Sequence, residues 1–308
     1  MWDIAQIITM CCAGSCTYCM YGSKLNTVEE VPLDDLLTFY KQIPDELTVK
    51  ITGGEPLQPN NLDRTLSFIS QLKQHCRLKA YQVNTNGAWG VPNVLLADPT
   101  CTIQVSCDGP AEYQNACYGQ EYFDKLVETL SLFRRSAASG TMMMVVTNET
   151  RHYVDYCAQL ARSNNVLFKS QWVSPVDLAS KQDVTERFTV MSQIQRRYGN
   201  ARVPAVVCGH RHSTPGKLYF SITADGRIVN CPIMSAVKTG LTIYNCTPLQ
   251  PEKIIAGINA AMADKTCQYP LGVRQAILTM SVQQLRSFSK HVTSQDKEDL
   301  KNVFDIDL

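Results

Sequence analysis

The chain has 308 residues, of which 44% are hydrophobic and 19% charged, with a formal net charge of +1. This length allows one large domain or two ordinary ones, and the hydrophobic content with balanced charge excludes an intrinsically disordered chain. No hydrophobic run is long enough to span a membrane, the amino terminus has no export signal, and no basic patch marks a nucleic-acid surface. These features predict a cytoplasmic protein that binds neither membrane nor nucleic acid.

Strand-like and helix-like segments alternate through the first part of the chain. Runs rich in β-branched, apolar or aromatic residues predict strands at residues 4–9, 47–52, 79–83, 102–106, 142–146 and 167–172. Helical periodicity between them predicts helices at residues 33–43, 62–75, 122–136 and 153–163, with a weaker one near 93–97. This alternation predicts parallel strands with right-handed crossovers. Six units are too few for a complete barrel, so the expected fold is α/β, a partial (β/α)6 barrel of the TIM type.

The remaining third of the chain has a different pattern. The expected elements are a helix at 181–198, strands at 217–223 and 228–231, and helices at 251–262 and, after Tyr269-Pro270, up to 286. Asp225-Gly226 lies between the two strands and is typical of a tight β-hairpin. We therefore expect a barrel domain at 1–200 and, at 201–308, a smaller domain built from a β-hairpin and helices.

Cysteine usage is the most informative feature of the composition. The chain has 13 cysteines, and four of them lie within residues 11–19. Cys12, Cys16 and Cys19 follow the first predicted strand on a short loop that contains Gly14, so their thiolates can face one point. Thiolates hold iron–sulfur clusters, usually four to a cluster, and three leave one iron open to an outside ligand. A zinc knuckle and a chance grouping of buried cysteines are the alternatives.

The string from Cys12 to Cys19 resembles the Cys-x3-Cys-x2-Cys signature of the radical S-adenosylmethionine (SAM) superfamily, in which an aromatic residue commonly precedes the third cysteine, as Tyr18 does here. Gly53-Gly54-Glu55-Pro56 follows the second predicted strand and resembles the glycine–glycine–glutamate motif of that superfamily. The resemblance implies a [4Fe–4S] cluster bound by Cys12, Cys16 and Cys19. It also implies that segment 53–56 holds the amino group of SAM, since glycine lets backbone approach a ligand and a carboxylate pairs with ammonium.

Polar residues end the next two predicted strands. Asn84-Thr85-Asn86-Gly87 ends the third strand, and Ser106-Cys107-Asp108-Gly109 ends the fourth. Ligand groups gather at the carboxyl ends of parallel strands, where loops are free to vary, although either string alone is an ordinary turn. The resemblance implies that this group contacts the ribose and carboxylate of SAM through Asn84, Asn86, Ser106 and Asp108. Cys107 and Cys117, in loops near the expected cavity, are candidate hydrogen-atom donors to a substrate radical.

A second cysteine set follows residue 200 and comprises Cys208, Cys231, Cys246 and Cys267. Cys208 precedes the predicted hairpin, and Gly226-x4-Cys231 closes it. This arrangement resembles the SPASM/twitch extension of radical SAM enzymes, in which such cysteines bind an auxiliary [4Fe–4S] cluster. The full SPASM pattern has more cysteines, so one auxiliary cluster is the most that this set implies. Buried structural cysteines and a zinc site are the alternatives.

The resemblance implies a reaction as well as a set of cofactors. Reductive cleavage of SAM yields a 5'-deoxyadenosyl radical, which abstracts hydrogen from the substrate in a chamber that excludes water. Relatives with SPASM or twitch extensions often crosslink, epimerise or excise parts of ribosomally made peptides, so a peptide is the expected substrate. Because the cluster loop starts at Cys12, we expect either a separate leader-binding partner protein or a small substrate. We also expect an external electron donor of the flavodoxin or ferredoxin type.

Two other functions are weighed against this one. The first is a radical SAM dehydrogenase that acts on a small molecule such as an aminosugar. The second is a non-enzymatic metal-binding or thiol-relay protein, which explains the cysteines but leaves segment 53–56 and the polar strand ends without a role.

Overall fold

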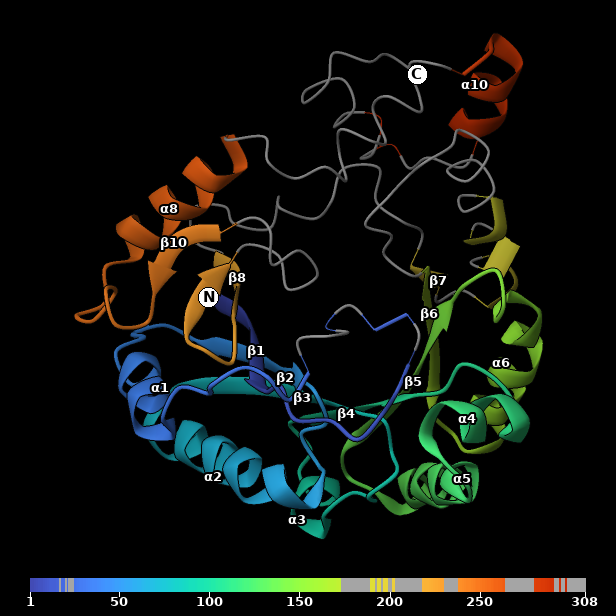
Figure 1. Cartoon of the computed structure of the whole chain (residues 1–308), viewed down its shortest axis with the longest axis horizontal. Helices are drawn as coiled ribbons and strands as arrows, with labels where there is room; N and C mark the ends of the chain where they lie inside the picture. Colours follow the sequence, from blue (N-terminus) through green and yellow to red (C-terminus); the bar gives the residue numbers. More distant parts are fainter. Residues whose placement is uncertain are drawn as a thin grey trace.

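The structure is a computed structural model that describes residues 1–16, 18–19, 21, 25–172, 189–191, 193–194, 196–198, 201–202, 218–229, 238–263, 280–290, 294 and 297. A curved sheet lies at its centre, with helices on the outer face and the segment that follows the first strand inside the curve (Figure 1). Among the described residues, no helix is both long enough and apolar enough to cross a membrane.

Six parallel strands form the main part of the sheet, and they pair in sequence order. They are β1 (Trp2–Thr9), β2 (Leu47–Gly53), β3 (Leu78–Thr85), β4 (Cys101–Ser106), β5 (Ser139–Val146) and β6 (Leu167–Trp172). The helices between them are α1 (Leu33–Tyr40), α2 (Pro59–His75), α3 (Asn93–Leu96), α4 (Ala111–Tyr118), α5 (Tyr122–Leu132) and α6 (Val154–Ser163). The predicted partial (β/α)6 barrel is confirmed.

The helices differ from the prediction in four main places. Helix α2 begins at Pro59 instead of residue 62. Helix α1 ends at Tyr40, because Pro44 disfavours helical backbone at the residue before it. Helix α5 ends at Leu132 and continues as a 3₁₀ turn, Phe133–Arg135. Helix α4 was not predicted, since Gln114 is its only buried residue and a helix without an apolar stripe has no periodic signal.

Side chains alternate between the two faces of the central strands. Val83 of β3 and Ile103 of β4 are fully buried in the hydrophobic core beneath the outer helices. Asn84, Gln104 and Ser106 occupy the intervening positions and stay partly accessible. Because successive residues of a strand point to opposite faces, the interior of the barrel is polar at this level. The barrel interior is therefore a site for a ligand, whereas the core lies between sheet and helices.

The carboxyl-terminal strands extend the same sheet. Strand β8 (Leu218–Ile222) pairs in parallel with β1, and β9 (Arg227–Val229) pairs antiparallel with β8 around Gly226, whose φ is +78°. The predicted hairpin is thus confirmed. The remaining elements are β7 (Ala201–Arg202) beside β6, β10 (Lys238–Thr242) beside β9, α8 (Pro251–Ala263) and α10 (Val282–Ser289). Most of the predicted helix at 181–198 lies outside the described residues, and its described residues are helical.

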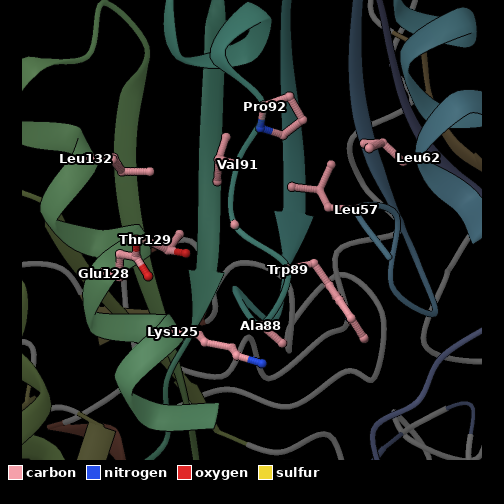
Figure 2. A pocket seen from close by; sticks show the side chains of 11 residues that line it. Leu57, Leu62, Ala88, Trp89, Val91, Pro92, Lys125, Glu128, Thr129 and Leu132 are labelled. Carbon is pink, nitrogen blue, oxygen red and sulfur yellow. The ribbon is translucent and has the colours of Figure 1, made fainter. Parts of the chain in front are cut away.

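The outer face has a groove of about 630 Å³ between α2 and α5 (Figure 2). The crossover from β3 to β4 contains only the four-residue α3, so no long helix fills this place. Most groove residues are hydrophobic, and the lining is Leu57, Leu62, Ala88, Trp89, Gly90, Val91, Pro92, Lys125, Glu128, Thr129 and Leu132. Leu57 and Ala88 belong to segments that also border the barrel interior, through Glu55 and Asn86.

Candidate active site

A pocket of about 220 Å³ opens on the inner face of the barrel. Residues of every predicted amino-terminal motif line it: Cys12, Cys16, Tyr18, Cys19, Gly53, Gly54, Glu55, Asn84, Asn86 and Ser106. The other lining residues are Gly14, Tyr21, Leu25, Thr52, Thr85, Gln104, Tyr118, Met143, Val145 and Gln171. In the described part of the chain, no three His, Cys, Asp or Glu side chains lie close enough to share a single metal ion. Cys12, Cys16 and Cys19 instead line one pocket together.

The loop that carries the thiols is held by side chains from outside it. The Asn26 side chain accepts a hydrogen bond from the backbone amide of Cys12 and donates one to its carbonyl oxygen, both at 3.1 Å. The side chain of Gln58, the residue before α2, accepts a hydrogen bond from the amide of Ala13 at 3.0 Å. The amide of Gly14 donates to Cys12 Sγ at 3.3 Å. The loop backbone is thus anchored while its sulfurs face the pocket.

Burial controls the ionisation of these thiols. Desolvation raises the pKa of Cys12, and it raises the pKa of Cys16 to about 12 although the Tyr118 hydroxyl beside Cys16 lowers it. At neutral pH the thiols of Cys12 and Cys16 are therefore protonated when no cluster is bound. Iron–sulfur ligation requires thiolates, so binding of a cluster at this loop releases protons.

Gly53 and Gly54 pass close to the start of the cysteine loop. Gly53 has a φ of +141°, and a Cβ there would lie 2.1 Å from the carbonyl oxygen of Thr9. A Cβ on Gly54 would lie 2.2 Å from the carbonyl oxygen of Cys11. The Gly54 amide donates a hydrogen bond to the carbonyl oxygen of Thr9 at 2.8 Å, and the Glu55 amide donates one to the carbonyl oxygen of Cys11 at 2.9 Å. Glycine is required here because backbone packs directly against backbone.

The Glu55 carboxylate joins the loop after β2 to the end of β3. It is only 2% exposed and accepts hydrogen bonds from the Leu57 amide at 2.9 Å, the Thr85 hydroxyl at 2.7 Å and the Asn86 amide at 2.6 Å. Burial raises the pKa of Glu55 to about 7, against the lowering effect of these donors. Pro56 is buried and is not among the pocket-lining residues.

Asp108 links the cysteine loop to the end of β5. Its carboxylate accepts a hydrogen bond from the Tyr18 hydroxyl and another from the Val145 amide, the latter at 2.6 Å. Asp108 is 1% exposed and does not line the pocket, and burial raises its pKa to about 6. The structure therefore places Asp108 behind Tyr18, which itself lines the pocket.

The ends of β3 and β4 supply neutral polar groups. Asn84 and Ser106 line the pocket from neighbouring strands. The side chain of Asn86 turns back to accept a hydrogen bond from the Ala88 amide at 2.9 Å, and its carbonyl oxygen accepts one from the Tyr122 hydroxyl. This wall of the pocket is therefore fixed by its own loop and by α5.

The sequence model of the Radical SAM superfamily matches residues 7–161, which is half of the chain and includes the cysteine loop and the polar strand ends. The chain belongs to the radical SAM superfamily. It is therefore an enzyme of a class that uses SAM and a [4Fe–4S] cluster. The pocket fits this pair, because three thiols, a buried carboxylate and several neutral polar groups converge on it.

Solved structures have the same fold. SuiB from Streptococcus suis bound to precursor peptide SuiA has a TM-score of 0.57 at 15% identity, and the match covers 75% of this chain but only 59% of SuiB. Native anSMEcpe with bound AdoMet has a TM-score of 0.61 at 15% identity, covering 98% of this chain and 100% of that chain. Its complex with AdoMet and the Kp18Cys peptide has a TM-score of 0.62 at 15% identity, with coverage of 98% and 99%. No curated protein sequence matches this radical SAM enzyme.

The two candidate hydrogen-atom donors do not line the pocket. Cys107 is fully buried, with its Sγ 3.6 Å from the carbonyl oxygen of Gly109, and it contacts Cys157 of α6. Cys117 is partly exposed near the end of α4, where its carbonyl oxygen accepts hydrogen bonds from Ser15. Cys117 therefore contacts the cysteine loop through its backbone carbonyl group.

Most of the second cysteine set lies outside the described residues, namely Cys208, Cys231 and Cys267. Cys246 is described and fully buried, and burial raises its pKa. Its Sγ lies 3.7 Å from the Asn245 side-chain oxygen. The auxiliary cluster therefore stays a prediction.

Several pocket residues were not singled out in the sequence. Gln104 and Gln171 are polar residues at inward positions of β4 and β6, and strict alternation along those strands was the signal that could have identified them. Tyr118 lies at the end of α4, a helix without a periodic pattern, so no local signal pointed to it.

Proposed function

We propose that Cys12, Cys16 and Cys19 hold the [4Fe–4S] cluster and that SAM binds in the pocket they share with Glu55. When bound, cluster and SAM supply a 5'-deoxyadenosyl radical, which removes a hydrogen atom from the substrate. The observation that carries this proposal is the single pocket in which the thiols meet the ends of β2, β3 and β4. A zinc knuckle or a thiol relay gives no reason for the buried carboxylate and the polar strand ends.

The chain's own residues bind and orient in this proposal. The Glu55 carboxylate, held by three donors, pairs with the ammonium group of SAM. Asn84, Asn86 and Ser106 offer amide and hydroxyl groups to the ribose and carboxylate. Asp108 acts indirectly, by holding Tyr18 against the loop that carries the thiols.

A ribosomally made peptide is the substrate class we propose. SuiB, which has the same fold, binds the precursor peptide SuiA, and anSMEcpe binds the Kp18Cys peptide together with AdoMet. The described inner strands present neutral groups, Gln104 and Gln171, beyond the predicted SAM residues. Carboxamides suit a peptide backbone, because they donate and accept hydrogen bonds at once. Crosslinking, epimerisation and backbone excision all begin with such a hydrogen abstraction.

The auxiliary module and the partners belong to the same proposal. Cys208, Cys231, Cys246 and Cys267 bind one further [4Fe–4S] cluster in a domain at 201–308, next to a barrel domain at 1–200. A flavodoxin or ferredoxin delivers the electron, and a separate protein binds the leader part of the peptide. Cys107 and Cys117 remain the proposed hydrogen donors, and neither lines the pocket in the structure.

Anaerobic reconstitution with iron and sulfide tests the core of the proposal. The expected results are the broad visible absorption of a [4Fe–4S] cluster and, with SAM and a reductant, formation of 5'-deoxyadenosine and methionine. The variant with Cys12, Cys16 and Cys19 replaced by alanine is expected to form neither product. Zinc at this loop in oxygen-free protein, or cluster formation without SAM cleavage, would contradict the proposal.

The substrate class needs a separate measurement. A short precursor peptide encoded beside the gene should increase 5'-deoxyadenosine formation and should change in mass. Stimulation by an aminosugar and not by the peptide would favour the small-molecule dehydrogenase.

A further inference from the structure

The carboxyl-terminal end of α4 lies against the loop that carries the thiols. The carbonyl oxygen of Cys117 accepts hydrogen bonds from the Ser15 amide at 3.3 Å and from the Ser15 hydroxyl at 2.8 Å. Because Ser15 is next to Cys16, these bonds fix the middle of the loop from the side of α4. Helix α4 lies in the crossover from β4 to β5, which already has α5 as its crossover helix.

Tyr118, the last residue of α4, reaches the sulfur of Cys16. The Cys16 thiol donates a hydrogen bond to the Tyr118 hydroxyl oxygen at 2.7 Å. A thiolate has no hydrogen to donate, so when Cys16 binds iron the Tyr118 hydroxyl becomes the donor in this contact. The Tyr118 ring crosses the loop at Gly14, where an added Cβ would lie only 2.8 Å from a ring carbon. The ring also stacks on Tyr122, with centroids 4.3 Å apart and planes inclined by 17°. Contacts of the ring with Gly14 and Tyr122 therefore restrain the direction in which the hydroxyl points.

The Tyr118–Tyr122 stack also links the cysteine loop to the end of β3. Tyr122 donates its hydroxyl hydrogen to the carbonyl oxygen of Asn86, at the end of β3. A continuous set of contacts therefore runs from Cys16 through Tyr118 and Tyr122 to Asn86. Movement of the Tyr118 ring is therefore restrained both by the cysteine loop and by segment 84–87, which is predicted to contact SAM.

We propose that Tyr118 is a positioning residue that donates a hydrogen bond to the cluster-bound sulfur of Cys16 and so raises the reduction potential of the cluster. This inference rests on the proposed function of the cysteine loop. Hydrogen bonds to cysteine sulfurs are among the features that set iron–sulfur potentials. Reduction adds negative charge to the cluster, and a donor in a buried site stabilises that charge more than it does in water.

The Tyr118→Phe variant isolates the hydroxyl. Phenylalanine keeps the ring that packs on Gly14 and Tyr122, so the fold should be preserved and the melting temperature should match that of the wild type. Tyr113→Phe is the matched control, since Tyr113 lies on the same helix and does not line the pocket. Both variants and the wild type are reconstituted anaerobically, assayed for iron, and titrated with a chemical reductant under electron paramagnetic resonance.

The expected result is a more negative midpoint potential in Tyr118→Phe alone. A tenfold fall in the equilibrium constant for one-electron reduction corresponds to about 59 mV. Full iron content with the midpoint of the wild type would overturn the inference. If only Tyr118→Phe fails to retain a cluster while its melting temperature is unchanged, the hydroxyl is required to hold the loop, which supports the positioning role.

A second measurement needs no variant. In a crystal structure of the cluster-loaded wild type, we expect the Tyr118 hydroxyl to stay within hydrogen-bond distance of Cys16 Sγ, and a separation beyond about 4 Å would overturn the inference. Failure of the wild type itself to assemble a [4Fe–4S] cluster would instead refute the proposed function. The two failures are therefore distinguishable.

Discussion

The backbone amide of Asn86 donates a 2.6 Å hydrogen bond to the buried carboxylate of Glu55. This bond joins the loop after β3 to the loop after β2. Glu55 and Asn86 line the inner pocket, whereas Leu57 and Ala88, two residues further along each loop, line the outer groove. The Glu55–Asn86 pair therefore belongs to the two loops that border both cavities. The relative position of these loops, both predicted to contact SAM, depends on this bond.

Glu55→Gln should weaken SAM binding and leave the iron content unchanged. The amide keeps one oxygen for the Leu57 and Thr85 donors, but it turns its own N–H groups toward the Asn86 amide, so two donors face each other. An unsatisfied buried donor costs roughly 1–3 kcal/mol, and about 1.4 kcal/mol is a tenfold change in affinity. We expect a loss of tenfold or more, measured by calorimetric titration of SAM into reconstituted enzyme.

Glu46→Gln is the control for this substitution. Glu46 is exposed, and its ion pair with Lys79, at 3.6 Å, is of the surface kind that contributes little. SAM affinity should be the same as in the wild type. Equal SAM affinity of Glu55→Gln and Glu46→Gln would refute the role assigned to Glu55.

The stability of the cluster-free protein should fall as pH rises through the titration range of Glu55. Burial raises its pKa from 4.5 to about 7, so the folded protein keeps a proton that the unfolded chain has already lost in this window. Stability is then highest below the unfolded value, declines between the two values by about 3 kcal/mol, and is level above the folded value. Urea unfolding at a series of pH values measures this decline.

Glu55→Gln removes the titrating group and should flatten most of that decline. Asp108 contributes a second decline at lower pH, since burial raises its pKa from 3.8 to about 6. A pH dependence between 4.5 and 7 that is unchanged in Glu55→Gln would show that Glu55 is ionised in the folded protein throughout this range.

The strands of the barrel and the segments that line the pocket are predictable from local sequence. Strands buried against helices must be rich in β-branched and apolar residues. The glycine pair at 53–54 is required because an added Cβ at either position would lie less than 2.3 Å from a backbone carbonyl oxygen. Both constraints are visible in a few consecutive residues. The order of the motifs along the chain then places them at one edge of the sheet.

Long-range partners were not predictable in the same way. Asp108 faces Tyr18 and the Val145 amide, a choice that depends on how β4, β5 and the cysteine loop come together. Cys107 points toward Cys157 of α6, away from the pocket, although its neighbour Ser106 lines it. Tyr118 meets Cys16 across more than 100 positions of sequence. Such contacts depend on how distant segments pack together, and a short stretch of sequence gives no information about that packing.

Gly54→Ala should reduce cluster content. An added Cβ would lie 2.2 Å from the carbonyl oxygen of Cys11, so either segment 53–55 or the start of the cysteine loop must move. Gly90→Ala is the matched control, because nothing lies within 4 Å of its added Cβ and only its φ of +72° costs strain, about 1 kcal/mol. Iron content per chain after reconstitution should fall in Gly54→Ala only. Equal iron in both variants would show that the close backbone contact does not position the thiols.

Replacing Cys12, Cys16 and Cys19 together with alanine separates the two predicted clusters. Each [4Fe–4S] cluster holds the same amount of iron, so this variant should retain about half of the wild-type iron if the second cysteine set binds an auxiliary cluster. SAM cleavage should be abolished, because this variant lacks the three thiols that line the pocket with Glu55. The converse variant, with Cys208, Cys231, Cys246 and Cys267 replaced, should also lose half of its iron but should still bind SAM. Iron near zero in the first variant, with an unchanged melting temperature, would show that the four later cysteines bind none and that Cys246 is a buried structural thiol.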